Sequence, residues 1–145
     1  MIALESILDF PHETLSPDIW TQSPDGEYVL RSDVKETLQL IVKWAQRKFK
    51  IPNMSANIIG SITSNRYSSD SDLDLHFSSP QFKQHKAEKF NELLKHQFKL
   101  LVQRNPELGS VNGVEIEVFM QPNPWVDMMS VGCYDVINNT WIVGP

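Results

Sequence analysis

The sequence predicts an α/β (α+β) domain in which a small mixed β-sheet is flanked by helices and a β-hairpin closes the C-terminal end. Residues 33–49 and 80–104 repeat apolar side chains at the spacing of an amphipathic helix. Residues 56–59, 72–77 and 114–121 are short and apolar or alternating, as β-strands are. The 145 residues suffice for one hydrophobic core, so we expect a single domain over residues 1–145.

The first helix is expected to begin with Asp33 as its N-cap, because Glu36 follows three residues later as in a capping box. Its apolar residues recur as far as Phe49, shortly before a proline. Residues 1–31 carry several prolines and a Pro-Asp-Gly turn signal, so they are predicted to form an irregular N-terminal lead around the domain.

The second helix is predicted to start at Ser79 and Pro80, since serine caps helices well and proline suits the first helical position. It is expected to end near Arg104, before Asn105-Pro106. Its exposed lysines are interpreted as a solvated helix face rather than a polyanion site. At the C-terminal end, CYDVINNTWIVG predicts a hairpin that turns at Asn138-Asn139.

Composition excludes some classes of protein. The formal net charge is −5, so any contact with nucleic acid would have to be local. Cys133 is the only cysteine, which excludes an internal disulfide and a cysteine-based zinc cluster. It is expected to be a small buried residue. No apolar run approaches the roughly 20 residues of a membrane span, and the first residues do not resemble a signal peptide. We therefore expect a cytoplasmic protein without a membrane partner.

An acidic alternation in SDSDLDLHF is the strongest chemical signal. Asp72 and Asp74 share one face of the predicted strand, because side chains alternate along an extended chain. Two close carboxylates repel each other unless a cation or a shared proton relieves them. Oxygen ligands suit Mg²⁺ or Mn²⁺ better than zinc. Asp70 is interpreted as a turn residue. His76 shares the face of Asp74, and is expected either to contact a ligand or to be a hydrogen-bonded sheet histidine.

A calcium loop of the EF-hand type is the alternative that the same aspartates raise. They match the first three alternating ligands of such a loop. The loop also needs glycine at its sixth position and glutamate at its twelfth, where this chain has Leu75 and Gln81. The alternation is therefore interpreted as part of a strand.

A Gly-Ser pair follows the first predicted strand of this region. Gly60 lets the backbone approach a ligand, and exposed amides after it can bind an anion. Ser61 adds a hydroxyl donor, and Arg66 is a candidate phosphate partner. These three residues are the predicted phosphate-binding or nucleotide-binding residues.

Together, these residues read IIGSITSNRYSSDSDLDLHF, which resembles the signature of the DNA polymerase beta-like nucleotidyltransferase superfamily. Members place Gly-Ser after an apolar strand, a spaced acidic pair on the next strand and a third acid on a later one. In VEIEVFMQ the third acid is expected to be Glu117, with Glu115 on the same strand face as the reserve candidate. The run EVFMQP, together with SPDIW and the end GCYDVINNTWIVGP, is similar to a group of small phage and bacterial predicted nucleotidyltransferases.

The resemblance implies a nucleotidyltransferase fold and a metal-dependent enzyme that moves a nucleoside monophosphate from a nucleoside triphosphate to an acceptor hydroxyl. It implies that Asp72, Asp74 and Glu117 are both catalytic residues and ligands of Mg²⁺ or Mn²⁺, with two ions expected. The acceptor is left open between a small molecule, a protein and an RNA. The chain has no room for the separate helical domain of larger relatives. The alternative is a non-catalytic nucleotide-binding or antitoxin-like interaction module of the same fold.

Overall fold

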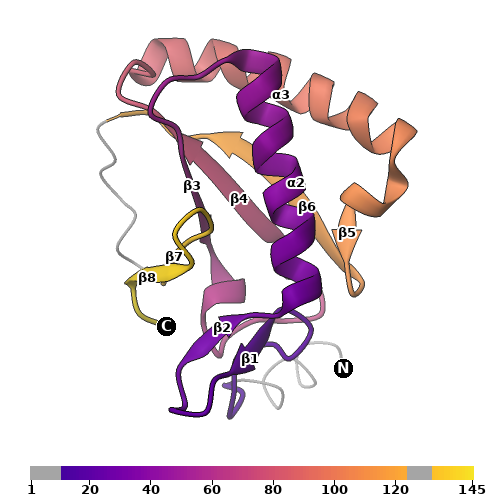
Figure 1. Ribbon diagram of the computed structural model, residues 1–145, viewed down its shortest axis with the longest axis vertical. Coiled ribbons are helices and arrows are strands. Elements are labelled where there is room, and N and C mark those ends of the chain that lie inside the picture. Colours follow the sequence, from indigo (N-terminus) through magenta and orange to yellow (C-terminus); the bar gives the residue numbers. More distant parts are fainter. Residues whose placement is uncertain (1–10, 124–131) are drawn as a thin grey trace, which may run out of the picture.

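The computed structural model describes residues 11–123 and 132–145 (Figure 1). The described elements are, in chain order, β1 (Trp20–Gln22), β2 (Tyr28–Leu30), α2 (Ser32–Phe49), β3 (Ser55–Ile59), the 3₁₀ turn η1 (Ser61–Thr63), β4 (Leu73–Ser78), α3 (Gln84–Arg104), the 3₁₀ turn η2 (Pro106–Leu108), β5 (Ser110–Val111), β6 (Val114–Met120), β7 (Cys133–Asp135) and β8 (Thr140–Val143). This mixture of helices and strands confirms the predicted α/β (α+β) class.

The main sheet has six strands in the order β5-β6-β4-β3-β7-β8. β4 and β6 are parallel, and the other neighbours are antiparallel. The predicted small mixed sheet is therefore confirmed. β4 lies between β3 and β6, which places the acidic segment at the centre of the sheet.

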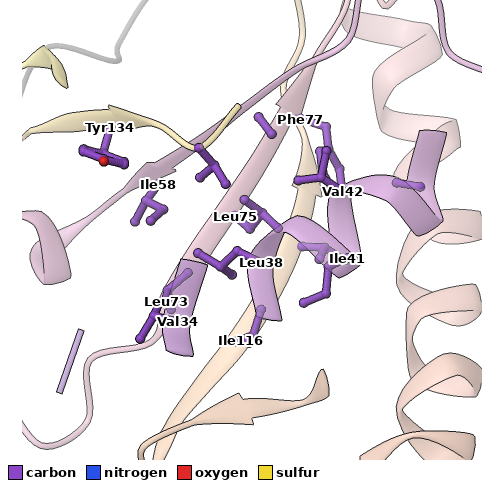
Figure 2. Close-up of a cluster of buried hydrophobic side chains, with 14 of the residues drawn as sticks. Val34, Leu38, Ile41, Val42, Ile58, Leu73, Leu75, Phe77, Ile116 and Tyr134 are labelled. Atoms are coloured by element: carbon purple, nitrogen blue, oxygen red, sulfur yellow. The ribbon is translucent and has the colours of Figure 1, made fainter. Parts of the chain in front are cut away.

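The hydrophobic core lies between α2 and one face of this sheet (Figure 2). Leu73, Leu75 and Phe77 of β4 are fully buried and alternate with half-buried polar residues. Leu38 and Ile41 of α2 pack over them. Because successive strand residues point to opposite faces, the polar residues of β4 point away from α2.

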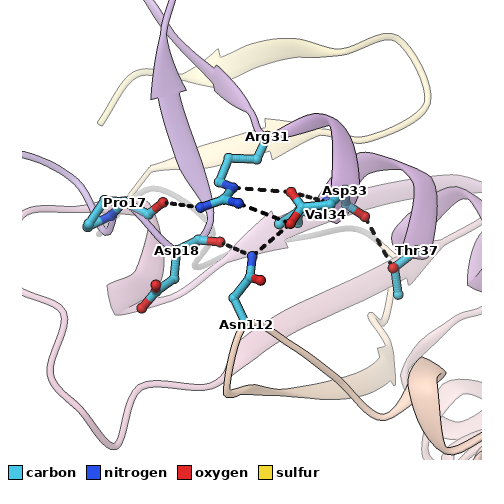
Figure 3. Close-up of polar contacts among 7 residues, drawn as sticks. All are labelled: Pro17, Asp18, Arg31, Asp33, Val34, Thr37 and Asn112. Atoms are coloured by element: carbon cyan, nitrogen blue, oxygen red, sulfur yellow. Dashed lines mark hydrogen bonds and ion pairs between the residues drawn. The ribbon is translucent and has the colours of Figure 1, made fainter.

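The start of α2 differs from the prediction. The helix begins at Ser32 with Arg31 at the N-cap, so Asp33 is its second residue and not its cap. The carboxylate of Asp33 accepts bonds from Arg31 and from the amide of Asn112 (Figure 3). Arg31 also donates to the carbonyl of Pro17. These contacts join the N-terminal lead, the start of α2 and the β5–β6 turn.

The N-terminal lead was predicted to be irregular over residues 1–31. Residues 1–10 lie outside the described part of the chain, and residues 11–31 are not irregular throughout. β1 and β2 form a two-stranded antiparallel sheet within it, with Trp20 opposite Leu30. Trp20 is buried and stacks on Trp141 of β8, while its indole N–H donates to the carbonyl of Ile62. The lead thus packs against both the C-terminal hairpin and η1.

The start of α3 also differs from the prediction. The helix begins at Gln84, after Lys83, rather than at Ser79 and Pro80. The hydroxyl of Ser79 donates to the carbonyl of Pro52, in the loop between α2 and β3, and so does not cap α3. Phe82 N–H donates to Ser79 O, which makes a separate turn before the helix. The predicted end at Arg104 is confirmed.

The other predicted boundaries hold to within a residue or two. β6 ends at Met120, one residue before the predicted end, and β4 begins at Leu73, one residue after the predicted start. The C-terminal hairpin is confirmed, since β7 and β8 pair antiparallel and Asn139 has a φ of 56°. Cys133 is buried as expected, and burial raises the pKa of its thiol to about 11. In the described part of the chain, no helix is both long and apolar enough to cross a membrane.

A buried amide fixes α3 beside β6. Asn91 is 8% exposed, and its side chain accepts a bond from Met120 N–H at 2.6 Å and donates to Met120 C=O at 2.9 Å. One side chain thus satisfies both backbone groups of a strand residue, as a neighbouring strand would. This contact sets the position of α3 relative to the strand that carries Glu117.

Replacing Asn91 with Leu is expected to lower the free energy of unfolding by about 2–4 kcal/mol. The change leaves two buried backbone groups of Met120 without partners, each at a cost of about 1–3 kcal/mol. Chemical denaturation followed by circular dichroism measures the change. Glu92, the exposed neighbour on the same helix, is the control, and its replacement by Ala should change stability by less than about 0.5 kcal/mol. Equal stabilities for both variants would contradict this account of how α3 is held.

Candidate functional site

Asp74 and Glu117 lie side by side on neighbouring strands. β4 and β6 are parallel, with Asp74 and Glu117 as partners in the register. Both alternate with buried residues, so their side chains point to the face that α2 does not cover. The two carboxyl groups are close enough for a proton on Asp74 to be shared with Glu117 in a hydrogen bond. The family resemblance implied that these two acids act together, and the structure places them next to each other.

The environment of Asp74 makes ionisation less favourable than it is for an exposed carboxyl group. Burial raises the pKa of its carboxyl, the charges of Glu117 and then Asp72 raise it further, and the pKa reaches about 6. The hydrogen bond with Glu117 acts in the same direction. A cation bound beside this carboxylate would relieve the same repulsion as the proton does.

Asp72 lies one residue before β4 and is half-buried. Its charge acts on Asp74, so it belongs to the same cluster. In residues 11–123 and 132–145, no three His, Cys, Asp or Glu side chains are arranged to hold a metal ion. Asp74 and Glu117 carry the hard oxygen atoms that suit Mg²⁺ or Mn²⁺, and Asp72 lies close enough for its charge to act on Asp74.

Glu115 differs from Glu117 in its neighbours. Both glutamates are exposed, but the register partner of Glu115 is Ser110 of β5 rather than a residue of β4. Glu117 is the acid beside Asp74, and Glu115 lies two residues before it toward the β5–β6 turn. The position of Glu117 agrees with the preference stated from the sequence.

Gly60 lies directly against the acidic pair. It follows β3, has a φ of 91°, and a Cβ atom built on it would lie 2.8 Å from Asp74 Oδ2. Such a φ is rarely adopted by residues with a side chain, and the short distance leaves no room for one. The two features together explain why glycine stands here, and the backbone passes closer to the carboxylate than any other residue type would allow.

The turn after Gly60 is exposed at its first residue and anchored behind it. Ser61 is exposed, and its hydroxyl is 2.8 Å from that of Ser71. Thr63 is buried and donates to the carbonyls of Gly60 and Gly132. The buried threonine holds the turn in place, while the serine hydroxyl lies on its exposed side beside Ser71.

Arg66 lies farther along the same loop. It is exposed, and its backbone N–H donates to the hydroxyl of Ser64. Its guanidinium contacts none of the acids in the described part of the chain. The loop contacts the N-terminal lead at two places. The rings of His12 and Tyr67 stack with their centroids 4.0 Å apart, and the backbone N–H of His12 donates to the backbone carbonyl of Asn65. The structure thus brings together Asp72, Asp74, Glu117 and Gly60, with Ser61 beside them, and leaves Arg66 at the rim.

A cleft of about 410 Å³ adjoins the acidic pair on the side of β6 and α3. Its walls combine acidic, basic, aromatic and aliphatic residues: Asp74, His76, Lys95, Phe98, Ile116, Glu117, Val118 and Phe119. His76 donates from Nδ1 to Gln121 Oε1 at 2.7 Å, so the expected hydrogen-bonded sheet histidine is confirmed. Burial, the largest influence, lowers the pKa of His76.

Sequence reasoning did not identify Lys95 or Phe119 as part of this site. The parity of β6 could have indicated Phe119, since it lies two residues after Glu117 on the same face. Nothing in the chain indicates Lys95, because its position depends on where α3 packs. Comparison of the chain with protein-family models, with curated proteins and with solved structures gave no match.

Proposed function

We propose that this protein is a metal-dependent nucleotidyltransferase that moves a nucleoside monophosphate from a nucleoside triphosphate to an acceptor hydroxyl. One observation carries the proposal: a single half-buried carboxylate, Asp74, touches a glycine turn on one side and a second acid on the other. The order Gly-Ser after β3, Asp72 and Asp74 at β4, and Glu117 on β6 agrees with the superfamily that the sequence resembles. The same order supports a nucleotidyltransferase fold.

In the proposed reaction, different residues bind the phosphates, accept the proton and hold the metal ions. The backbone of Gly60 and the hydroxyl of Ser61 would bind the phosphates, and Arg66 would pair with them from the rim. Glu117 would accept the proton of the acceptor hydroxyl, whose oxygen bonds to the α-phosphorus while the bond to the leaving pyrophosphate breaks. Asp72, Asp74 and Glu117 would hold Mg²⁺ or Mn²⁺, with two ions expected. When bound, these ions neutralise phosphate charge and make the hydroxyl more acidic.

Labelled nucleotides test the reaction. Each nucleoside triphosphate, labelled at the α-phosphorus, is incubated with Mg²⁺ and the protein in the presence of total RNA, a protein extract or its small-molecule fraction. We expect label on one acceptor class and release of pyrophosphate. Chelation of the metal should abolish both. Absence of label and of pyrophosphate with every triphosphate and every fraction would reject the enzyme.

Glu117 and Glu115 provide a matched pair of variants. We expect Glu117→Gln to lower the transfer rate by about 10-fold to 100-fold, because it removes a proton acceptor and a negative charge beside Asp74. Glu115→Gln removes the same charge two residues away and should leave the rate unchanged. The rates are measured as pyrophosphate release under identical conditions. The reverse order of effects would make Glu115 the third acid.

The non-catalytic nucleotide-binding or antitoxin-like module is the second candidate function. It is favoured by the absence, among the described residues, of three side chains arranged to hold a metal ion. Calorimetry distinguishes the module from the enzyme. It is carried out with Mn²⁺ and a triphosphate analogue that cannot be cleaved between its α- and β-phosphates. Binding of the analogue without transfer to any acceptor would favour the module.

A further inference from the structure

The cleft beside Glu117 lies on the opposite side of Asp74 from the glycine turn. β4 pairs with β3 along one edge and with β6 along the other. Gly60 follows β3, whereas the cleft extends from Glu117 across β6 to α3. A triphosphate on the glycine turn and a second ligand in the cleft would therefore approach Asp74 from different sides, without competing for the same space.

The cleft offers an aromatic surface. Phe119 is half-buried, and its ring centroid is 5.0 Å from that of His76, at a tilt of 43°. The bond to Gln121 fixes the imidazole. Phe98 of α3 adds a second apolar wall. A flat ring can pack against such a surface, and the fixed imidazole sets where the ring stops.

The cleft also offers one cation on a flexible side chain. Lys95 is exposed on α3, and its Nζ lies 5.5 Å from the centroid of the Phe119 ring. Among the described residues it forms no ion pair. Contact of a lysine with an aromatic face is weak at an exposed site, and a charge-assisted bond to an anion is stronger. An anionic ligand would thus draw the ammonium group off the ring and free that ring face for stacking.

We propose that this cleft binds the acceptor, and that the acceptor is a small molecule with a flat ring and an anionic group; this inference rests on the proposed function. The ring lies on Phe119, the anion pairs with Lys95, and the hydroxyl to be modified is at Glu117. Glu117 takes the hydroxyl proton as the new oxygen–phosphorus bond forms and pyrophosphate leaves. A volume of about 410 Å³ suits a ligand of this size.

Three probes test the ligand class in the intact protein with Mg²⁺, by nuclear magnetic resonance titration. 4-Hydroxyphenyl phosphate carries the ring, the hydroxyl and the anion, phenol lacks the anion, and inorganic phosphate lacks the ring. We expect the first to bind about tenfold more tightly than either of the others. Phe119→Leu and Lys95→Gln should each weaken it about tenfold. Lys89→Gln, an exposed lysine on the same helix outside the cleft, is the control and should bind as the wild type does.

The outcomes separate this inference from the proposed function. Absence of binding by 4-hydroxyphenyl phosphate, or binding that Phe119→Leu and Lys95→Gln leave unchanged, overturns the ligand class, whether or not the protein transfers nucleotides. Binding that both variants weaken, in a protein that transfers no nucleotide, rejects the enzyme and keeps the cleft as a site for ring-bearing anions. Asp74→Asn should retain binding of the probe, because it removes a negative charge from the cleft wall without touching Phe119 or Lys95.

Discussion

Asp74→Asn is expected to abolish nucleotide transfer, with a loss of about 1,000-fold or more, while the protein stays folded. The amide has nearly the same shape as the carboxyl group but cannot carry its charge, and catalysis of this type depends on charge placed at the reacting phosphate. Asp74 lies between Gly60 and Glu117. Gly60 has no side chain and Glu117 is already one of the acids of the proposed site, so neither can supply the missing charge. Transfer is measured as pyrophosphate release with the acceptor fraction that the labelling experiment identifies.

The same variant should be more stable than the wild type when no metal is present. Burial and the neighbouring acids raise the pKa of Asp74 to about 6 in the folded protein, from a usual value of about 4. The stabilisation that its proton brings is therefore complete below about pH 4 and is lost as the pH rises through 6. At pH 7.5 the ionised carboxylate is repelled by the acids beside it. The half-buried position leaves part of this repulsion screened by solvent, so Asn should stabilise the protein by about 1–2 kcal/mol.

Thermal unfolding at pH 5 and pH 7.5, with a chelator and then with Mn²⁺, measures both effects. Wild type should gain stability from Mn²⁺ at pH 7.5, whereas Asp74→Asn should gain little. Asp70→Asn, at an exposed position in the preceding turn, serves as the control and should behave as the wild type does. Full activity in a folded Asp74→Asn protein would end the enzymatic proposal. An unchanged unfolding temperature without metal would contradict the repulsion.

Strand parity explains why part of the site could be predicted from the sequence. The alternation of Leu73, Leu75 and Phe77 with Asp74 and His76 assigns each side chain to a face, whatever the partner strands are. The same holds for β6, where the apolar residues alternate with the two glutamates. The buried pattern and the face on which each acid lies follow from this local rule, whereas the central position of β4 depends on its pairing with β3 and β6.

The errors concern contacts between distant segments. Asp33 and Ser79 both have the chemistry of helix caps, but each side chain is bound by a residue far away in the chain. Ser79 is held by Pro52, and Asp33 is held by Asn112. Capping preference is worth about 1 kcal/mol, so a tertiary hydrogen bond can outweigh it and shift a helix start by several residues.

The cleft could not be predicted for a related reason. Lys95 reaches Phe119 because Asn91 fixes α3 along β6, and no local pattern indicates that an asparagine inside a helix will bind a strand. Nothing in the sequence distinguishes Lys95 from the other lysines of α3. Only the packing of the helix places it in the cleft. The acidic residues of the site can thus be predicted from local sequence patterns. The residues that would select a ligand are brought together by packing between distant segments.

Replacement of Gly60 is expected to have the second large effect, because backbone strain and a steric collision both arise at this residue. Its φ of 91° strains any residue that has a side chain, at about 1–3 kcal/mol. A methyl group there would also lie 2.8 Å from Asp74 Oδ2, so the carboxylate would have to move. Gly26 separates these costs, because it has a φ of 86° and a methyl group on it would meet nothing within 4 Å.

We expect Gly60→Ala to lower the free energy of unfolding by about 2–4 kcal/mol, as strain and collision add. Gly26→Ala should lose only the part that comes from strain. Transfer by Gly60→Ala should fall about 100-fold to 1,000-fold, since displacement of a catalytic group by about 1 Å costs about 100-fold and the phosphate-binding backbone moves with it. Gly26→Ala should transfer at the wild-type rate. Measurements are made well below the unfolding temperature of each variant, so that loss of fold does not lower the rate. If Gly60→Ala transferred nucleotides as fast as Gly26→Ala, then the contact between the glycine turn and Asp74 would have no part in the reaction, and the phosphates would have to bind elsewhere.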